Sequence, residues 1–132
     1  MKLPPGAQSF PVPIYGGRVV VCVTRDAWQE TSELLGYERD KDIDAVDGYC
    51  FRAVTKQKRS RYMVGVFANR EETLVHEIAH AAFQILRHAN VKITHANDEA
   101  YAYLIGELHA RASRTMRKLM TRDGEASGTS AR

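Results

Sequence analysis

The segment Asn69–Asn90 constrains the fold of this chain most, because it predicts a helix that is apolar over most of its surface. Asn69-Arg70-Glu71-Glu72 at its start is typical of a capping box, with Asn69 as the N-cap and Glu72 at the third helical position. Its apolar side chains are Leu74, Val75, Ile78, Ala79, Ala82, Phe83, Ile85 and Leu86. A helix of this kind is expected at the centre of a domain.

Three polar residues interrupt this apolar helix in the pattern H-E-x-x-H. His76 and His80 are four residues apart, so their side chains lie on one helix face and can converge on one zinc ion. Glu77 is rotated by about 100° and can reach a water bound to that ion. Polar groups on a buried helix are costly without partners. The pattern therefore predicts a zinc centre, with a metal-free His/Glu network as the alternative.

A catalytic zinc normally has three protein ligands, which leaves one to be found. The candidates downstream are His88, His95, Asp98, Glu99, Glu107 and His109. Phe83 and Leu86 occupy the glycine and third histidine positions of the extended H-E-x-x-H-x-x-G-x-x-H pattern, which excludes a metzincin.

We prefer Glu99 to Asp98, because Ala102, Tyr103 and Gly106 share the helix face of Glu99. Small residues there would let the two helices approach closely enough to share a metal.

The remaining pattern predicts a small α+β domain over residues 18–122. Strands are expected at Arg18–Thr24, Tyr49–Val54 and Arg61–Ala68, and helices at Asp26–Leu35 and Ala96–Thr121. Asp26 is the expected N-cap of the first helix. We expect a three-stranded antiparallel sheet that is covered on one face by helices.

Two terminal segments are expected to lie outside this domain. All four prolines stand at positions 4, 5, 11 and 13, so residues 1–17 are expected to be an extended lead-in. Residues 123–132 are small and polar and are expected to form a disordered tail.

Composition predicts a single water-soluble domain. The chain has 132 residues, 44% hydrophobic and 27% charged, with a formal charge of +3. Cys22 and Cys50 stand in apolar runs and show no disulfide framework, and no segment reads as a signal peptide or membrane span. We therefore expect a cytoplasmic protein that does not enter a membrane.

Basic residues gather between Lys56 and Arg61 and in the second half of the last helix. Solvated surfaces are the favoured interpretation of both, and nucleic acid is not the expected partner.

H-E-I-A-H at 76–80, followed by Glu99 and Gly106 on the next helix, resembles the gluzincin pattern of zinc metallopeptidases. Over residues 60–108 the chain is similar to minimal ImmA/IrrE-like members and to small H-E-x-x-H proteins of bacteriophages and prophages. The resemblance implies His76, His80 and Glu99 as zinc ligands and Glu77 as general base. It also implies that residues 61–68 form an edge strand that pairs with an extended peptide substrate. Such families often place Asn or Asp shortly after the ligand Glu, where this chain has Tyr103.

The expected activity is hydrolysis of peptide bonds by a zinc-activated water, with Glu77 accepting its proton. The developing oxyanion would need a second donor besides zinc, for which we favour Tyr103 or His95. The other candidates are His88, Tyr101 and His109. The alternative function is a non-catalytic structural or virion-assembly protein that retains a metallopeptidase scaffold.

Overall fold

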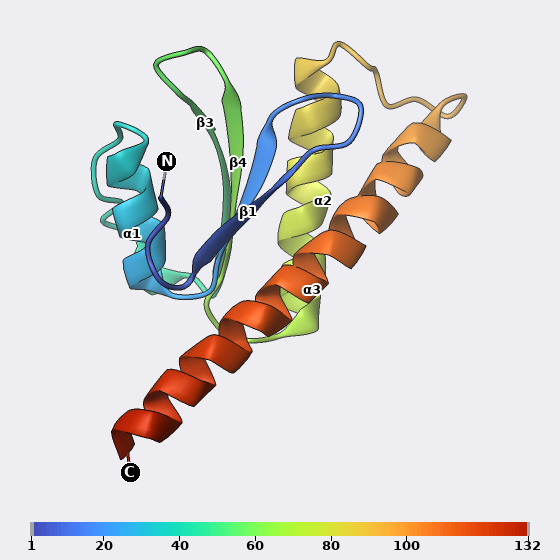
Figure 1. The fold of residues 1–132 in the computed structure, drawn as a ribbon. Coiled ribbons are helices and arrows are strands. Elements are labelled where there is room, and N and C mark those ends of the chain that lie inside the picture. Colours follow the sequence, from blue (N-terminus) through green and yellow to red (C-terminus); the bar gives the residue numbers. More distant parts are fainter. Residues whose placement is uncertain (1, 132) are drawn as a thin grey trace.

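A computed structural model describes the backbone of residues 2–131 and the side chains of residues 2–122. Figure 1 shows a sheet with helices on both sides. The strands are β1 (Ala7–Pro11), β2 (Arg18–Cys22), β3 (Gly48–Val54) and β4 (Ser60–Val66). The helices are α1 (Arg25–Leu34), the 3-10 turn η1 (Ile43–Ala45), α2 (Glu71–His88) and α3 (Asp98–Ala131).

The sheet is mixed, with strand order β1-β2-β4-β3. β1 runs antiparallel to β2 and β3 runs antiparallel to β4, whereas β2 and β4 are parallel. The α+β class is confirmed, but the prediction of three antiparallel strands is wrong. Because α1 and β3 are inserted between β2 and β4, the chain returns to the sheet in the direction of β2.

The fourth strand, β1, lies in the segment that was expected to be an extended lead-in. Its last residue, Pro11, stands opposite Arg18 at the outer edge of the sheet. Proline is tolerated there because an edge strand needs only one row of hydrogen bonds. The domain thus begins earlier than residue 18.

Helices cover both faces of the sheet, not one. On one face Val19, Val21 and Val64 pack with α2 and α3, and on the other Val20 and Met63 pack with α1. All four residues from Val19 to Cys22 are buried. A continuously apolar strand of this kind is typical of a sheet buried on both sides.

Both predicted helix caps are wrong. Helix α1 is capped by Thr24, whose hydroxyl accepts a 3.0 Å hydrogen bond from the Ala27 amide, while Asp26 lies in the first turn. Helix α2 has Arg70 at the cap position with no side-chain capping bond. Asn69 cannot cap it because it has turned into the left-handed region, at φ 50°.

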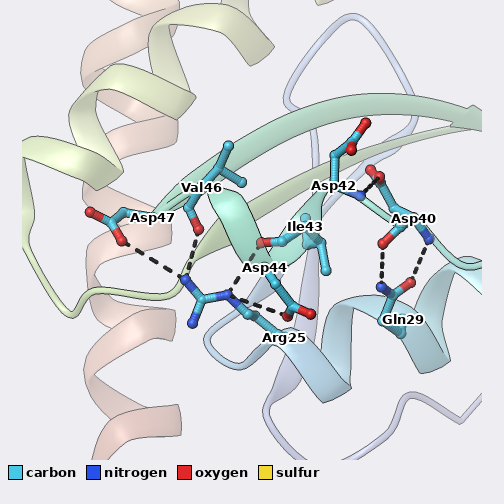
Figure 2. Close-up of polar contacts among 8 residues, drawn as sticks. All are labelled: Arg25, Gln29, Asp40, Asp42, Ile43, Asp44, Val46 and Asp47. Atoms are coloured by element: carbon cyan, nitrogen blue, oxygen red, sulfur yellow. Dashed lines mark hydrogen bonds and ion pairs between the residues drawn. The ribbon is translucent and has the colours of Figure 1, made fainter.

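One arginine of α1 fixes the loop that leads into β3 (Figure 2). Arg25 donates to the carbonyl oxygens of Ile43 (3.2 Å) and Val46 (2.8 Å), and its guanidinium lies 3.8 Å from an Asp47 carboxylate oxygen. Arg25 also lies over the Phe67 ring, 5.2 Å from its centroid. The start of β3 is therefore anchored from the opposite layer.

Among the described residues, no helix combines the length and apolar character of a membrane span. Helix α3 continues to Ala131, so the backbone of residues 123–131 is helical where the sequence predicted a disordered tail.

Candidate metal centre

Helix α2 presents one side to the sheet and the other to solvent. Leu74, Ile78 and Ile85 are fully buried in the core formed with β2, β4 and α3, whereas His76 and His80 are exposed. The prediction that all three polar residues of the motif sit on a buried element is therefore correct only for Glu77, which is 6% exposed.

The two histidines face each other across one turn of α2. Their Nε2 atoms are 3.2 Å apart, and their rings meet edge to face with centroids 4.8 Å apart. Two nitrogens that each lie 2.0–2.1 Å from a tetrahedral zinc are about 3.3–3.4 Å apart. The observed separation fits this requirement, so this pair of side chains suits a shared metal.

Glu77 is the third member of this group. One oxygen of its carboxylate and one ring nitrogen of each histidine all lie within 4.8 Å of one another. Burial raises the pKa of Glu77 above its ordinary value, and the nearby His76 and His80 act in the opposite direction. The carboxyl is thus more basic than a solvated glutamate, as a proton acceptor requires.

The start of β3 lies directly against Glu77. A Cβ atom built on Gly48 would stand 2.9 Å from Glu77 Oε2 and 2.6 Å from Thr73 Cγ2. Only glycine fits there without moving one of these groups. Sequence reasoning missed this residue, although a glycine at a strand end often marks a close approach of another group.

Cys50 is the second neighbour that sequence reasoning missed. Burial, with the Glu77 charge, raises the pKa of its thiol to about 12. Its Sγ lies 3.7 Å from Gln84 Oε1, one turn beyond His80 on α2. The thiol is therefore an uncharged lining group beside the carboxylate.

The predicted third zinc ligand is not part of this group. Asp98 and Glu99 are exposed in the first turn of α3, and among the described residues neither joins the cluster of His76, Glu77 and His80. Tyr101 ties this end of α3 to α2 through a 2.9 Å hydrogen bond from its hydroxyl to the Ala79 carbonyl oxygen.

The reason for preferring Glu99 is wrong. Ala102, Tyr103 and Gly106 are exposed, and a Cβ on Gly106 would meet nothing within 4 Å. The helix α3 packs instead through a stripe spaced four residues apart, Leu104, Leu108 and Ala112. Glu99 itself stays a prediction.

The candidate oxyanion donors are exposed or contact other groups. Tyr103 is 77% exposed, and His95 is exposed in the α2–α3 loop. His88 contacts Arg52, and His109 Nε2 lies 3.4 Å from Glu71 Oε2. The assignments of Tyr103 and His95 stay predictions.

Comparison with known proteins gives no matching family model, no significantly similar curated protein and no significantly similar solved structure. The geometry of this group is therefore the basis for proposing a function.

Proposed function

We propose that the chain is a zinc-dependent metallopeptidase whose metal is held by His76 and His80. The observation that carries the proposal is the 3.2 Å separation of the two Nε2 atoms, with the buried Glu77 carboxylate within 4.8 Å of the pair. The third ligand is proposed from the first turn of α3, Glu99 or Asp98. When bound there, zinc polarises a substrate carbonyl and lowers the pKa of a coordinated water towards about 7.

Glu77 has the role of general base in this proposal. Its carboxylate is buried between Gly48 and the two histidines, and burial raises its pKa. It accepts the proton of the attacking water and passes it to the leaving amine nitrogen, which departs as a neutral amine.

The proposed substrate-pairing strand is β3, which replaces the strand expected from sequence. Strand β4, at residues 60–66, has β2 on one side and β3 on the other, so it offers no free edge. β3 is paired only with β4 within residues 2–131 and begins beside Glu77. An extended peptide can add to such an edge through main-chain hydrogen bonds.

The backbone pattern identifies which residues face this edge. Within the hairpin, the Thr55 amide donates to the Arg59 carbonyl and the Phe67 amide donates to the Asp47 carbonyl. The Val54 amide points the other way and donates to the Tyr37 hydroxyl. Because the pattern alternates along a strand, Cys50 and Arg52 direct their amide and carbonyl groups to the open edge. These two residues are the proposed contacts of a substrate backbone.

Elemental analysis of the purified chain tests the metal claim. We expect one zinc per wild-type chain, loss of zinc in His76→Ala, and retention in the matched control His88→Ala. A reduction in Glu99→Gln but not in Asp98→Asn assigns the third ligand. Stoichiometric zinc in His76→Ala would contradict the proposal.

Hydrolysis is tested separately with a peptide library and the Glu77→Gln variant. This variant should keep its zinc and lose cleavage by a factor of 10² or more, since general-base catalysis is worth about 10²–10⁴. Zinc binding without any wild-type cleavage above Glu77→Gln would favour a non-catalytic assembly role.

A further inference from the structure

A concave site lies at the end of the sheet remote from Gly48. It is a cavity of about 510 Å³ between the β1–β2 turn, the β3–β4 turn and the last turn of α2. All three segments lie at the top of Figure 1. His88, at this end, is three turns further along α2 than Glu77, about 16 Å away. The cavity is therefore distinct from the proposed metal centre.

Four basic residues line this cavity: Arg18, Lys58, Arg59 and Arg61. Arg18 and Arg61 also line an adjoining cavity of about 300 Å³, together with Ser9. Arg18 and Arg61 stand opposite each other on the parallel strands β2 and β4. Like charges placed opposite on neighbouring strands destabilise a sheet. Burial, together with Arg18 and Arg59, lowers the pKa of Arg61 below its ordinary value. The protein thus concentrates positive charge where folding alone would disfavour it.

The protein does not neutralise this charge itself. The cavity lining contains no aspartate or glutamate, and no ion pair between the side chains of residues 2–122 includes any of the four basic residues. By contrast, the half-buried Arg25 of α1 has both Asp44 and Asp47 within 4.0 Å. The four basic residues around the cavity thus stand together without an acidic side chain among them.

Two of the guanidiniums are held in place. Arg18 Nε donates to Ser9 Oγ at 2.9 Å, and Arg61 Nη1 donates to the Ser60 carbonyl oxygen at 3.0 Å. Each guanidinium has five N–H donors, so most of its donors are left for a ligand. Gly17 keeps the rim free of a side chain, because a Cβ there would lie 3.0 Å from the Ser60 carbonyl oxygen.

We infer that this cavity binds the polyphosphate group of a small molecule, through Arg18, Arg61, Lys58 and Arg59. Guanidinium forks match phosphate oxygens in pairs, and a charge of three to four negative units balances the four cations. The four cations gather at one end of the sheet, where Arg18 and Arg59 lie close enough to Arg61 to act on its charge. Proteins that follow a nucleic-acid backbone place their cations along an extended groove. A small polyphosphate ligand is therefore favoured over nucleic acid.

Isothermal titration calorimetry with inorganic tripolyphosphate, pyrophosphate and phosphate tests this inference. We expect one site per chain, with affinity increasing from phosphate to tripolyphosphate. Arg61→Gln should weaken tripolyphosphate binding at least tenfold. The double variant Lys58→Gln/Arg59→Gln, which changes only the exposed β3–β4 turn, should weaken binding by a similar factor. Glu77→Gln should bind like the wild type, which separates this site from the metal centre.

The matched control is Arg114→Gln/Arg117→Gln, which removes two charges from the exposed surface of α3. Its tripolyphosphate affinity should stay within twofold of the wild type. The inference is overturned if tripolyphosphate does not bind at millimolar concentration in low salt, or if the control loses as much affinity as the cavity variants. Tighter binding of a single-stranded oligonucleotide that depends on Arg61 would also overturn it, in favour of a nucleic-acid site.

Discussion

At the scale of single residues, the candidate site depends on a contrast in burial within one helical turn. His76 and His80 reach solvent, while Glu77 between them is buried against the first residue of β3. The contrast arises because neighbouring helix residues point about 100° apart. Two solvent-facing histidines and a desolvated carboxylate can therefore lie side by side.

Gly48→Ala should disturb this arrangement directly. The new Cβ meets Thr73 Cγ2 at 2.6 Å and Glu77 Oε2 at 2.9 Å, so β3 or α2 has to move. We expect a loss of about 1–3 kcal/mol in the free energy of unfolding, measured in urea, because overpacking costs that much.

Gly106→Ala is the matched control for that substitution. Its Cβ meets nothing within 4 Å on the exposed side of α3. Alanine is the better helix former, so stability should rise by about 0.5–1 kcal/mol. An unchanged Gly48→Ala variant would show that β3 does not press on Glu77.

At the scale of elements, the helices could be predicted from sequence but the sheet could not. Helix α2 follows from its periodic apolar residues, and the motif spacing placed His76 and His80 correctly on one face. The sheet order depends on pairings between distant segments such as β2 and β4, which local pattern does not encode. Strand β1 was missed because prolines at 11 and 13 suggested a loop, whereas an edge strand tolerates Pro11.

The candidate site shows the same division between local and long-range information. Gly48 and Cys50 approach Glu77 only because β3 packs on α2. The H-E-x-x-H pattern therefore could not predict them. The face of α3 was misjudged because small residues were given more weight than the Leu104, Leu108 and Ala112 stripe.

Capping of α1 provides a test at this scale. Thr24→Ala removes the side-chain acceptor of the Ala27 amide and should lower the free energy of unfolding by about 1 kcal/mol. Asp26→Ala loses only a favourable charge in the first turn and should cost about 0.3–0.5 kcal/mol. Chemical denaturation of both variants measures the difference, and the reverse ranking would make Asp26 the cap.

The anchor of the β3 loop gives a second test. Arg25→Met removes two hydrogen bonds to the carbonyls of Ile43 and Val46, and we expect a loss of about 1–3 kcal/mol in urea. Arg39→Met removes only an exposed ion pair with Glu33 and should cost less than about 1 kcal/mol. Equal losses would mean that the loop is not fixed by Arg25.

At the scale of the whole molecule, the buried Cys22 thiol should lower the stability of the fold at alkaline pH. Burial raises the pKa of Cys22 from 9.0 to about 12. Between these values the unfolded chain has lost a proton that the folded protein keeps, so stability falls as pH rises. This one thiol should contribute a decline of about 1.4 kcal/mol per pH unit.

Urea unfolding of the wild type and of Cys22→Ala at pH 9.5 and 10.5 measures that contribution. The variant should show a shallower decline, by about 1.4 kcal/mol per unit, whatever its stability at pH 7. If the free energy of unfolding fell equally with pH in both proteins, the Cys22 thiol would have the same pKa in the folded and the unfolded chain.

The parallel pairing of β2 with β4 also bears on how the chain folds during synthesis. Arg18 and Arg61 are aligned in this pair although they are 43 residues apart. At about 5–20 residues per second, a ribosome needs roughly 2–9 s to deliver the second strand after the first. During that interval β2, with its run of valines, exposes an unpaired edge. The nascent first half of this chain therefore carries an unpaired hydrophobic strand edge until β4 has been synthesised.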